Sequence, residues 1–142
     1  MHQFPKLTLE EVKIGIEGCR KRATAIGVPM DIAITDETGN LLAFERMNGA
    51  LVGCIQIAID KAYTASVFGV ATEELGSTSQ PGGPDYGLNT ASGGRFIIFA
   101  GGVPIRYGKN IVGGVGCSSG TAQQDADVAK AGVSVIQQHM SK

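Results

Sequence analysis

Tryptophan is absent from this sequence of 142 residues, only 6% of the residues are aromatic, and only 18% are charged. The formal net charge is −1 and the longest basic run is Arg20-Lys21-Arg22, so we expect neither nucleic acid nor an anionic membrane surface as a partner. No apolar run approaches the roughly 20 residues of a transmembrane helix, and the first residues lack the plan of a signal peptide. These absences predict a cytoplasmic protein.

Cysteine is scarce, with Cys19, Cys54 and Cys117 at long spacings and no C-x-x-C pair. An odd number in this pattern argues against a disulfide framework and a zinc knuckle, and it predicts reduced thiols. No acidic calcium loop and no histidine and cysteine cluster with metal spacing occurs either. We therefore expect no dedicated structural metal.

Glycine, in contrast, is abundant, with 21 residues and no Gly-X-Y repeat, which indicates turns, caps and close backbone contacts. The length and the 43% apolar content fit one domain over residues 1–142 with one core. The segment 76–94 predicts a loop longer than compact domains normally contain without a function. It is a candidate for a segment that covers a ligand or for an oligomer contact.

Helical periodicity appears at both ends of the chain and in its middle. A capping box of Thr8 and Glu11 predicts a helix that ends near Gly27. Small residues at helical spacing predict a second helix over about 51–68, and a short helical turn begins at about residue 72. The last helix is expected from Ser119 or Gly120 onward.

Five short segments have the alternation or the apolar character of strands. Residues 30–35 and 41–46 flank a turn and predict a β-hairpin, and the runs 95–100, 103–107 and 111–117 predict three consecutive antiparallel strands. The expected order is α-β-β-α-β-β-β-α. Because strands this close in sequence cannot be parallel, we predict an α+β fold with a five-stranded antiparallel sheet flanked by helices.

The stretch Gly113–Gly120 leaves a strand and enters a helix, so its free amides are a candidate site for a carboxylate or phosphate. The alternative is that Ser119 is an N-cap and that the glycines allow tight packing. Cys117 at the mouth of this helix has the setting of a thiol with a lowered pKa. No base is located beside it, so a small buried core residue is the alternative to a nucleophile, and we assign no catalytic residue.

Arg46 and Lys61 lie in apolar sequence surroundings, where an unpaired charge is costly. Each therefore needs an internal carboxylate or an anionic ligand, and the candidate carboxylates are Asp125, Asp60 and Asp36. His139, in the last turn of the final helix, is typical of a charge partner at a helix C-terminus.

Several motifs occur in one order along nearly the whole chain: residues 33–41, 46–50, 60–65, 101–105, and 113–120 with Gln124-Asp125. This set resembles the GlcG/HbpS-like family, which includes the C-terminal domain of PduO-type proteins. The resemblance implies a profilin-like fold, assembly into homodimers or higher homo-oligomers, and binding of haem or a corrinoid. Haem degradation is attributed to some members, so the resemblance leaves open whether this chain is an enzyme, and a binding protein is favoured.

The motif positions supply candidate ligand-binding residues: Arg46, Lys61, Gly102, Pro104, Gly116, Ser118, Ser119 and Gly120. The candidate axial ligands for haem are His2, His139 and Cys117. The first hypothesis is a homo-oligomeric protein that receives a tetrapyrrole or a small anion between the glycine-rich strands and the 76–94 loop. The alternatives are an accessory subunit of a neighbouring diol, glycerol or hydroxy-acid enzyme with no ligand of its own, and an enzyme that uses Cys117.

Overall fold

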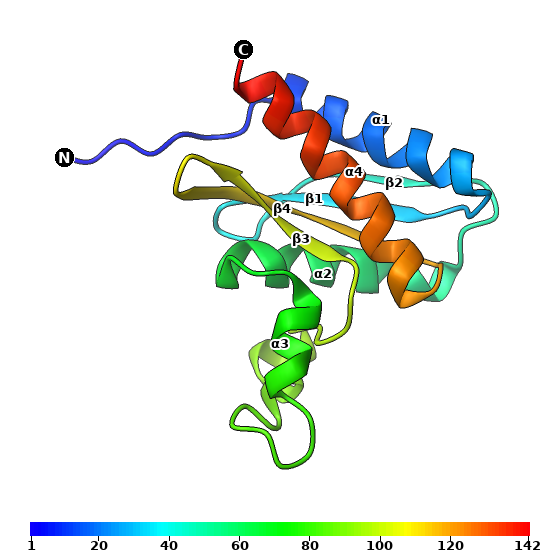
Figure 1. Ribbon diagram of the computed structural model, residues 1–142, viewed down its shortest axis with the longest axis vertical. Helices are drawn as coiled ribbons and strands as arrows, with labels where there is room; N and C mark the ends of the chain where they lie inside the picture. Colours follow the sequence, from blue (N-terminus) through cyan, green and yellow to red (C-terminus); the bar gives the residue numbers. More distant parts are fainter.

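The computed structural model describes all 142 residues as a layered α+β fold (Figure 1). Helices α1 (Leu9–Ile26) and α4 (Ala122–Met140) cover one face of an antiparallel sheet, and α2 (Ile55–Phe68) covers the other. The short helix α3 (Thr72–Thr78) and the segment after it project away from the sheet (Figure 1). None of the helices has the length and apolar character needed to span a bilayer.

The sheet contains β1 (Asp31–Asp36), β2 (Leu41–Arg46), β3 (Gly102–Tyr107) and β4 (Asn110–Ser118). Their order is β2-β1-β4-β3 and every neighbouring pair is antiparallel. The predicted β-hairpin is therefore present as β1 and β2, the last two of the three predicted consecutive strands pair as β3 and β4, and the inner strands β1 and β4 join the two pairs. The predicted five-stranded sheet is wrong, because the sheet has four strands.

The missing strand is the apolar run 95–100, whose backbone bonds to helix side chains instead of to a neighbouring strand. The Thr64 hydroxyl of α2 donates to the carbonyl of Arg95 and accepts from the N–H of Ile97. The Thr72 hydroxyl of α3 donates to the carbonyl of Phe99 at 2.6 Å. Since these threonines satisfy three of the backbone polar groups of the run, the segment lies along the helices and outside the sheet.

Helix α1 begins and ends where the sequence predicts. Thr8 Oγ1 accepts from the N–H of Glu11 at 3.2 Å, and Glu11 Oε1 accepts from the N–H of Thr8 at 2.8 Å. Gly27 closes the helix with a φ of 72°, in the left-handed region that glycine adopts without strain.

The other helices differ in detail from the prediction. A 3₁₀ turn, η1 (Val52–Cys54), precedes α2, so the α-helix begins later than residue 51. The segment 76–94 contains the end of α3 and two more 3₁₀ turns, η2 (Leu88–Thr90) and η3 (Ser92–Gly94). Ser119 is not the N-cap of α4; Thr121 is, in a second capping box with Gln124.

Two apolar layers hold the sheet between the helices. The main core of 15 buried residues includes Val12 of α1, Ile32 of β1 and Val128 of α4. The layer under α2 is much thinner, because a Cβ at Gly114 or Gly116 of β4 would overlap backbone carbonyls of that helix. Helix α2 therefore lies on the sheet at backbone contact distance, as the glycine content and the small-residue stripe predict.

Candidate functional site

Lys61 of α2 is completely buried, and the chain supplies all of its polar partners. Its Nζ donates to Asp125 Oδ2 and to the carbonyl oxygen of Cys117, both at 2.9 Å. The ring centroid of Phe99 lies 5.1 Å from the same nitrogen. This geometry confirms the internal ion pair predicted for Lys61, and it selects Asp125 among the three candidate carboxylates.

Asp125 also occupies the anion position at the end of the glycine-rich stretch. The N–H of Gly120 donates to Asp125 Oδ1 at 2.9 Å, and the carboxylate lies in the first turn of α4. A carboxylate at this place is stabilised by the amide, by the helix N-terminus and by Lys61 together. The side chain of the protein itself therefore takes the position in which the sequence suggested an external anion.

The remaining predicted residues of this region pack against one another. Gly102 and Gly116 allow the backbone of α2 to approach, and Pro104 and Ser118 are buried in β3 and β4. Ser119 has a φ of 114°, and its Oγ accepts from a backbone N–H of the segment before α2 at 3.0 Å. Helix α2 therefore covers the face of the glycine-rich strands.

Cys117 does not have the properties of a nucleophile. Its side chain is completely buried, and its Sγ lies 3.9 Å from Sγ of Cys19, which is equally buried. Burial, followed by the hydrogen bond with Cys19, raises the pKa of the Cys117 thiol well above its usual value. The lowered pKa suggested by the position beside the helix is wrong, and the alternative of a small core residue is confirmed.

Arg46, the second cation that the sequence predicts to need a partner, lies at the end of β2 beside a surface cleft. This Arg46 cleft has a volume of about 540 Å³ and is larger than the other principal cavities. Its walls are the end of α1, residues 27–29 and residues 45–48. Across the cleft, Arg20 forms an ion pair with Glu45 at 2.7 Å, whereas exposed Arg46 forms none within the chain.

Asp31 lies between the Arg46 region and the end of β4 near Lys61 and Asp125, and the sequence analysis did not identify it. In the sheet it lies between Arg46 of β2 and Ser118 of β4. The residue is completely buried, and neither carboxylate oxygen has a hydrogen-bond partner. The available signal was a charged residue directly before the apolar run Ile32-Ala33-Ile34.

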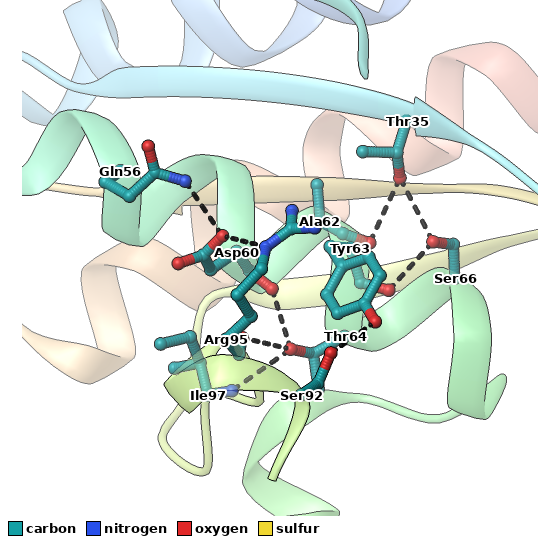
Figure 2. Close-up of polar contacts among 10 residues, drawn as sticks. All are labelled: Thr35, Gln56, Asp60, Ala62, Tyr63, Thr64, Ser66, Ser92, Arg95 and Ile97. Atoms are coloured by element: carbon teal, nitrogen blue, oxygen red, sulfur yellow. Dashed lines mark hydrogen bonds and ion pairs between the residues drawn. The ribbon is translucent and has the colours of Figure 1, made fainter. Parts of the chain in front are cut away.

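A second polar cluster missed by the sequence reasoning lies on the outer side of α2. Figure 2 shows Asp60 between Gln56 and Arg95, each of which donates to Asp60 Oδ1 at 2.9 Å. The Arg95 guanidinium stacks 3.9 Å from the ring centroid of Tyr63, whose hydroxyl bonds Ser92 at 2.8 Å. These partners are all internal, so the cluster fastens the 92–97 segment to α2.

None of the candidate haem ligands lines one of the principal cavities. His2 is exposed in the N-terminal segment, which extends away from the rest of the chain in Figure 1. Cys117 is completely buried in the core. His139 lies in the last turn of α4 with its Nδ1 3.6 Å from Glu11 Oε2. Met47 lines the Arg46 cleft, but its sulfur accepts from the N–H of Met30 at 3.4 Å. The residues of one chain therefore do not supply an axial ligand for haem iron at this cleft.

No group of three metal-ligating side chains occurs anywhere in the chain. Among the residues that line the Arg46 cleft, Arg46 has a guanidinium without an ion-pair partner, and such a group binds carboxylates through two parallel hydrogen bonds.

Comparison with known proteins agrees with this architecture. In Klebsiella pneumoniae, the protein ORFY has a crystal structure with a TM-score of 0.93 and 33% identity, covering 96% of this chain and 94% of that one. The structure of a PduOC:haem complex has a TM-score of 0.89 and 30% identity over 92% and 95% of the two chains. HbpS has a TM-score of 0.86 and 27% identity over 95% and 93%.

Two sequence relatives come from Citrobacter freundii. An uncharacterised 15.0 kDa protein of the dhaT-dhaS intergenic region is 35% identical over 90% of both chains. The corrinoid adenosyltransferase PduO is 36% identical over 81% of this chain, which spans only 34% of that enzyme. The family model of the haem degrading protein HbpS-like matches residues 7–134, and this chain belongs to the HbpS-like family.

Proposed function

We propose that this chain is a binding protein for a carboxylate-bearing ligand and that the ligand binds at the Arg46 cleft. The observation that carries the proposal is Arg46, an exposed residue without an ion-pair partner, among the residues that line a 540 Å³ cleft at the edge strand β2. A volume of this size lies within the range of about 300–1,000 Å³ typical of small-molecule sites. The apolar wall at Pro29 and Met47 would contact the body of the ligand.

Haem is the favoured ligand class, because a family relative 30% identical to this chain forms a haem complex. Haem presents two propionate carboxylates, which suit an arginine, whereas the cleft offers its iron no axial ligand. The proposed recognition therefore acts on the carboxylates of the tetrapyrrole and not on the metal.

The test is an absorbance titration with haemin, metal-free protoporphyrin IX and the dimethyl ester of protoporphyrin. We expect haemin and the metal-free porphyrin to bind with the same affinity and the ester to bind at least tenfold more weakly. Arg46→Gln should weaken binding of the free acids by a similar factor, since a hydrogen bond to a charged group contributes about 1.5–3 kcal/mol. Lys109→Gln, which removes an exposed cation far from the cleft, is the matched control.

Two results would contradict the proposal. Binding of haemin without binding of the metal-free porphyrin would mean that iron ligation dominates. Absence of any saturable spectral shift would remove the tetrapyrrole class altogether.

A second candidate is corrinoid handling as an accessory protein, because PduO contains a region similar to this chain. Cobalamin carries amides where haem carries carboxylates, so its binding would not depend on Arg46. Saturable binding of hydroxocobalamin that Arg46→Gln leaves unchanged would favour this candidate. Co-purification with a diol, glycerol or hydroxy-acid enzyme from the native organism would support the accessory role.

The proposal includes one domain over residues 1–142, homo-oligomeric assembly and a cytoplasmic location. Assembly is supported by exposed apolar side chains at the end of α2, where Val67 is 40% and Phe68 is 41% exposed. Native mass spectrometry of the protein counts the subunits, and a monomeric mass at micromolar concentration would contradict this part.

A further inference from the structure

The two outer strands of the sheet, β2 and β3, differ in the state of their free edges. In an antiparallel ladder, every second residue of a strand bonds to its neighbour, and the residues between them point their N–H and C=O groups outward. On an outer strand these outward groups can bind a further strand, unless the fold blocks them.

The outward positions of β3 follow from one hydrogen bond at its start. The N–H of Cys117 in β4 donates to the carbonyl of Gly101 at 2.9 Å, so residue 101 bonds inward. Alternation along the β3–β4 ladder then leaves three outward residues: Gly102, Pro104 and Arg106.

The chain closes the β3 edge at all three of these positions. The N–H of Gly102 donates to Thr72 Oγ1, and the N–H of Arg106 donates to Gln137 Oε1, both at 3.0 Å. Pro104 has no N–H to offer. Each outward N–H of β3 is therefore bound or absent, so this edge does not support a further antiparallel strand.

The edge of β2 is open in comparison. The N–H of Met47 donates to the carbonyl of Met30 at 3.0 Å, so alternation makes Glu45 bond inward and points the backbone groups of Phe44 and Arg46 outward. None of the side chains of the chain bonds to these outward groups. The strand also lacks the lysines and prolines by which edges are commonly protected.

The same edge exposes apolar side chains. Leu41 is 47% and Leu42 is 40% exposed, and Phe44 is half-buried. The irregularity of the β1–β2 ladder lies before residues 43–46, which pair regularly with β1. A regular edge strand with free backbone groups and apolar side chains is a surface to which another strand adds.

We propose that the β2 edge is a dimer interface, at which β2 of one copy pairs antiparallel with β2 of a second copy. Since the β3 edge is closed, two copies can join their sheets only through β2. This contact is two-fold symmetric, and the joined sheet ends on both sides at a closed edge, so it does not grow into a fibre. The inference rests on the homo-oligomeric assembly included in the proposed function, and it names the surface for it.

Electrostatic complementarity selects the register of the two strands. With Phe44 opposite the partner's Arg46, all outward backbone groups of these two residues are bound, and each guanidinium lies beside an aromatic ring, which attracts a cation. Shifting the strands so that Arg46 faces the partner's Arg46 would oppose like charges. On the other face Glu45 meets the partner's Glu45, but each keeps Arg20 as its counterion at 2.7 Å.

The test gives β2 the feature that closes β3, a proline at an outward position. Arg46→Pro removes the outward N–H at a place where an edge strand tolerates proline, and Arg46→Gln, the matched control, removes the same charge but keeps the N–H. Sedimentation equilibrium without ligand measures the dimer dissociation constant. We expect that of Arg46→Pro to exceed that of Arg46→Gln about tenfold or more, because each dimer loses two interchain hydrogen bonds.

Hydrogen–deuterium exchange of the natural protein tests the same surface if Arg46→Pro fails to fold. The amides of Phe44 and Arg46 should exchange more slowly above the dimer dissociation constant than below it. The amide of Lys109, in the turn of the other hairpin, should exchange at the same rate at both concentrations.

The outcomes separate this inference from the proposed function. Equal dissociation constants for the two folded variants, or exchange at Phe44 and Arg46 that does not change with concentration, would overturn the inference alone. A natural protein that stays monomeric at high concentration would overturn the assembly part of the proposed function, and the inference with it. The porphyrin titration tests the ligand part independently of both.

Discussion

Replacing Lys61 by methionine should destabilise the fold more than the loss of any surface ion pair. The substitution keeps most of the side-chain volume but leaves Asp125, whose side chain is only 5% exposed, without its cation. Breaking a buried pair by removing one partner costs about 3–5 kcal/mol, because an uncompensated charge stays in the interior.

The contacts of Lys61 lead to a similar magnitude. Two hydrogen bonds from the ammonium group are lost, one to Asp125 and one to the carbonyl of Cys117, both 2.9 Å long. At about 1.5–3 kcal/mol for each bond to a charged group, the loss is about 3–6 kcal/mol. For a chain of this size such a loss lowers Tm by about 6–20 °C.

Urea unfolding of Lys61→Met, Asp125→Asn and the double variant measures both the loss and the coupling. The double variant should lose less than the sum of the single losses, since each single change leaves the other partner unpaired. Arg22→Met is the matched control, because Arg22 and Asp127 also form a 2.9 Å pair but are 46% and 43% exposed. An exposed pair contributes less than about 1 kcal/mol. A loss for Lys61→Met no larger than that of Arg22→Met would refute the reasoning.

Three further predictions concern packing, thiol access and acid stability. Gly116→Ala should abolish or severely weaken folding, because its Cβ would overlap the carbonyl oxygen of Ala58, whereas Gly53→Ala, with no atom within 4 Å of the new Cβ, should fold normally by circular dichroism. A thiol reagent should label Cys54 alone in the native protein, and rapid labelling of three thiols before unfolding would contradict the burial of the other two. Burial opposes ionisation of Asp36, but hydrogen bonds from the Thr38 hydroxyl and two backbone amides outweigh it and lower its pKa below 3.8. The contribution of ionised Asp36 to the stability of the fold is therefore present above pH 3.8 and is lost as the pH falls through the pKa of Asp36 in the folded protein. The Tm of Asp36→Asn should be lower than that of the natural protein at pH 7 and should equal it in strong acid.

Local signals predicted the parts of the fold that depend on neighbouring residues. The Thr8 capping box and Gly27 mark the ends of α1, and polar turn residues separate the strands of the first hairpin. In each case the deciding interactions lie within a few residues of one another, so the sequence displays them directly.

The run 95–100 was mistaken for a strand because its partners are distant in sequence. Its apolar content suits a strand, yet its carbonyls and amides bond to Thr64 and Thr72, about 30 residues away. Nothing in a local pattern distinguishes a threonine that satisfies a loop from one that faces solvent.

The candidate site was predicted in part. The cost of an unpaired charge identified Lys61 as a residue that needs either an internal carboxylate or an anionic ligand, and Asp125 is its partner. The cleft beside Arg46 was not visible, since α1 and two separate segments form its walls. Asp31 was missed because its environment depends on strand pairing with both β2 and β4.

The strand order also has a consequence for the route by which the chain folds. β1 with β2 and β3 with β4 are local hairpins, which can form within about 1–10 μs. The central pairing of β1 with β4 joins residues that are distant in sequence, such as Thr35 and Gly114, which are 79 positions apart. Closing so long a loop costs chain entropy before any contact compensates it, and long-range pairings of this kind slow folding. The slow step should therefore be the meeting of the two hairpins, and α2, which contacts both inner strands, is placed to bring them together.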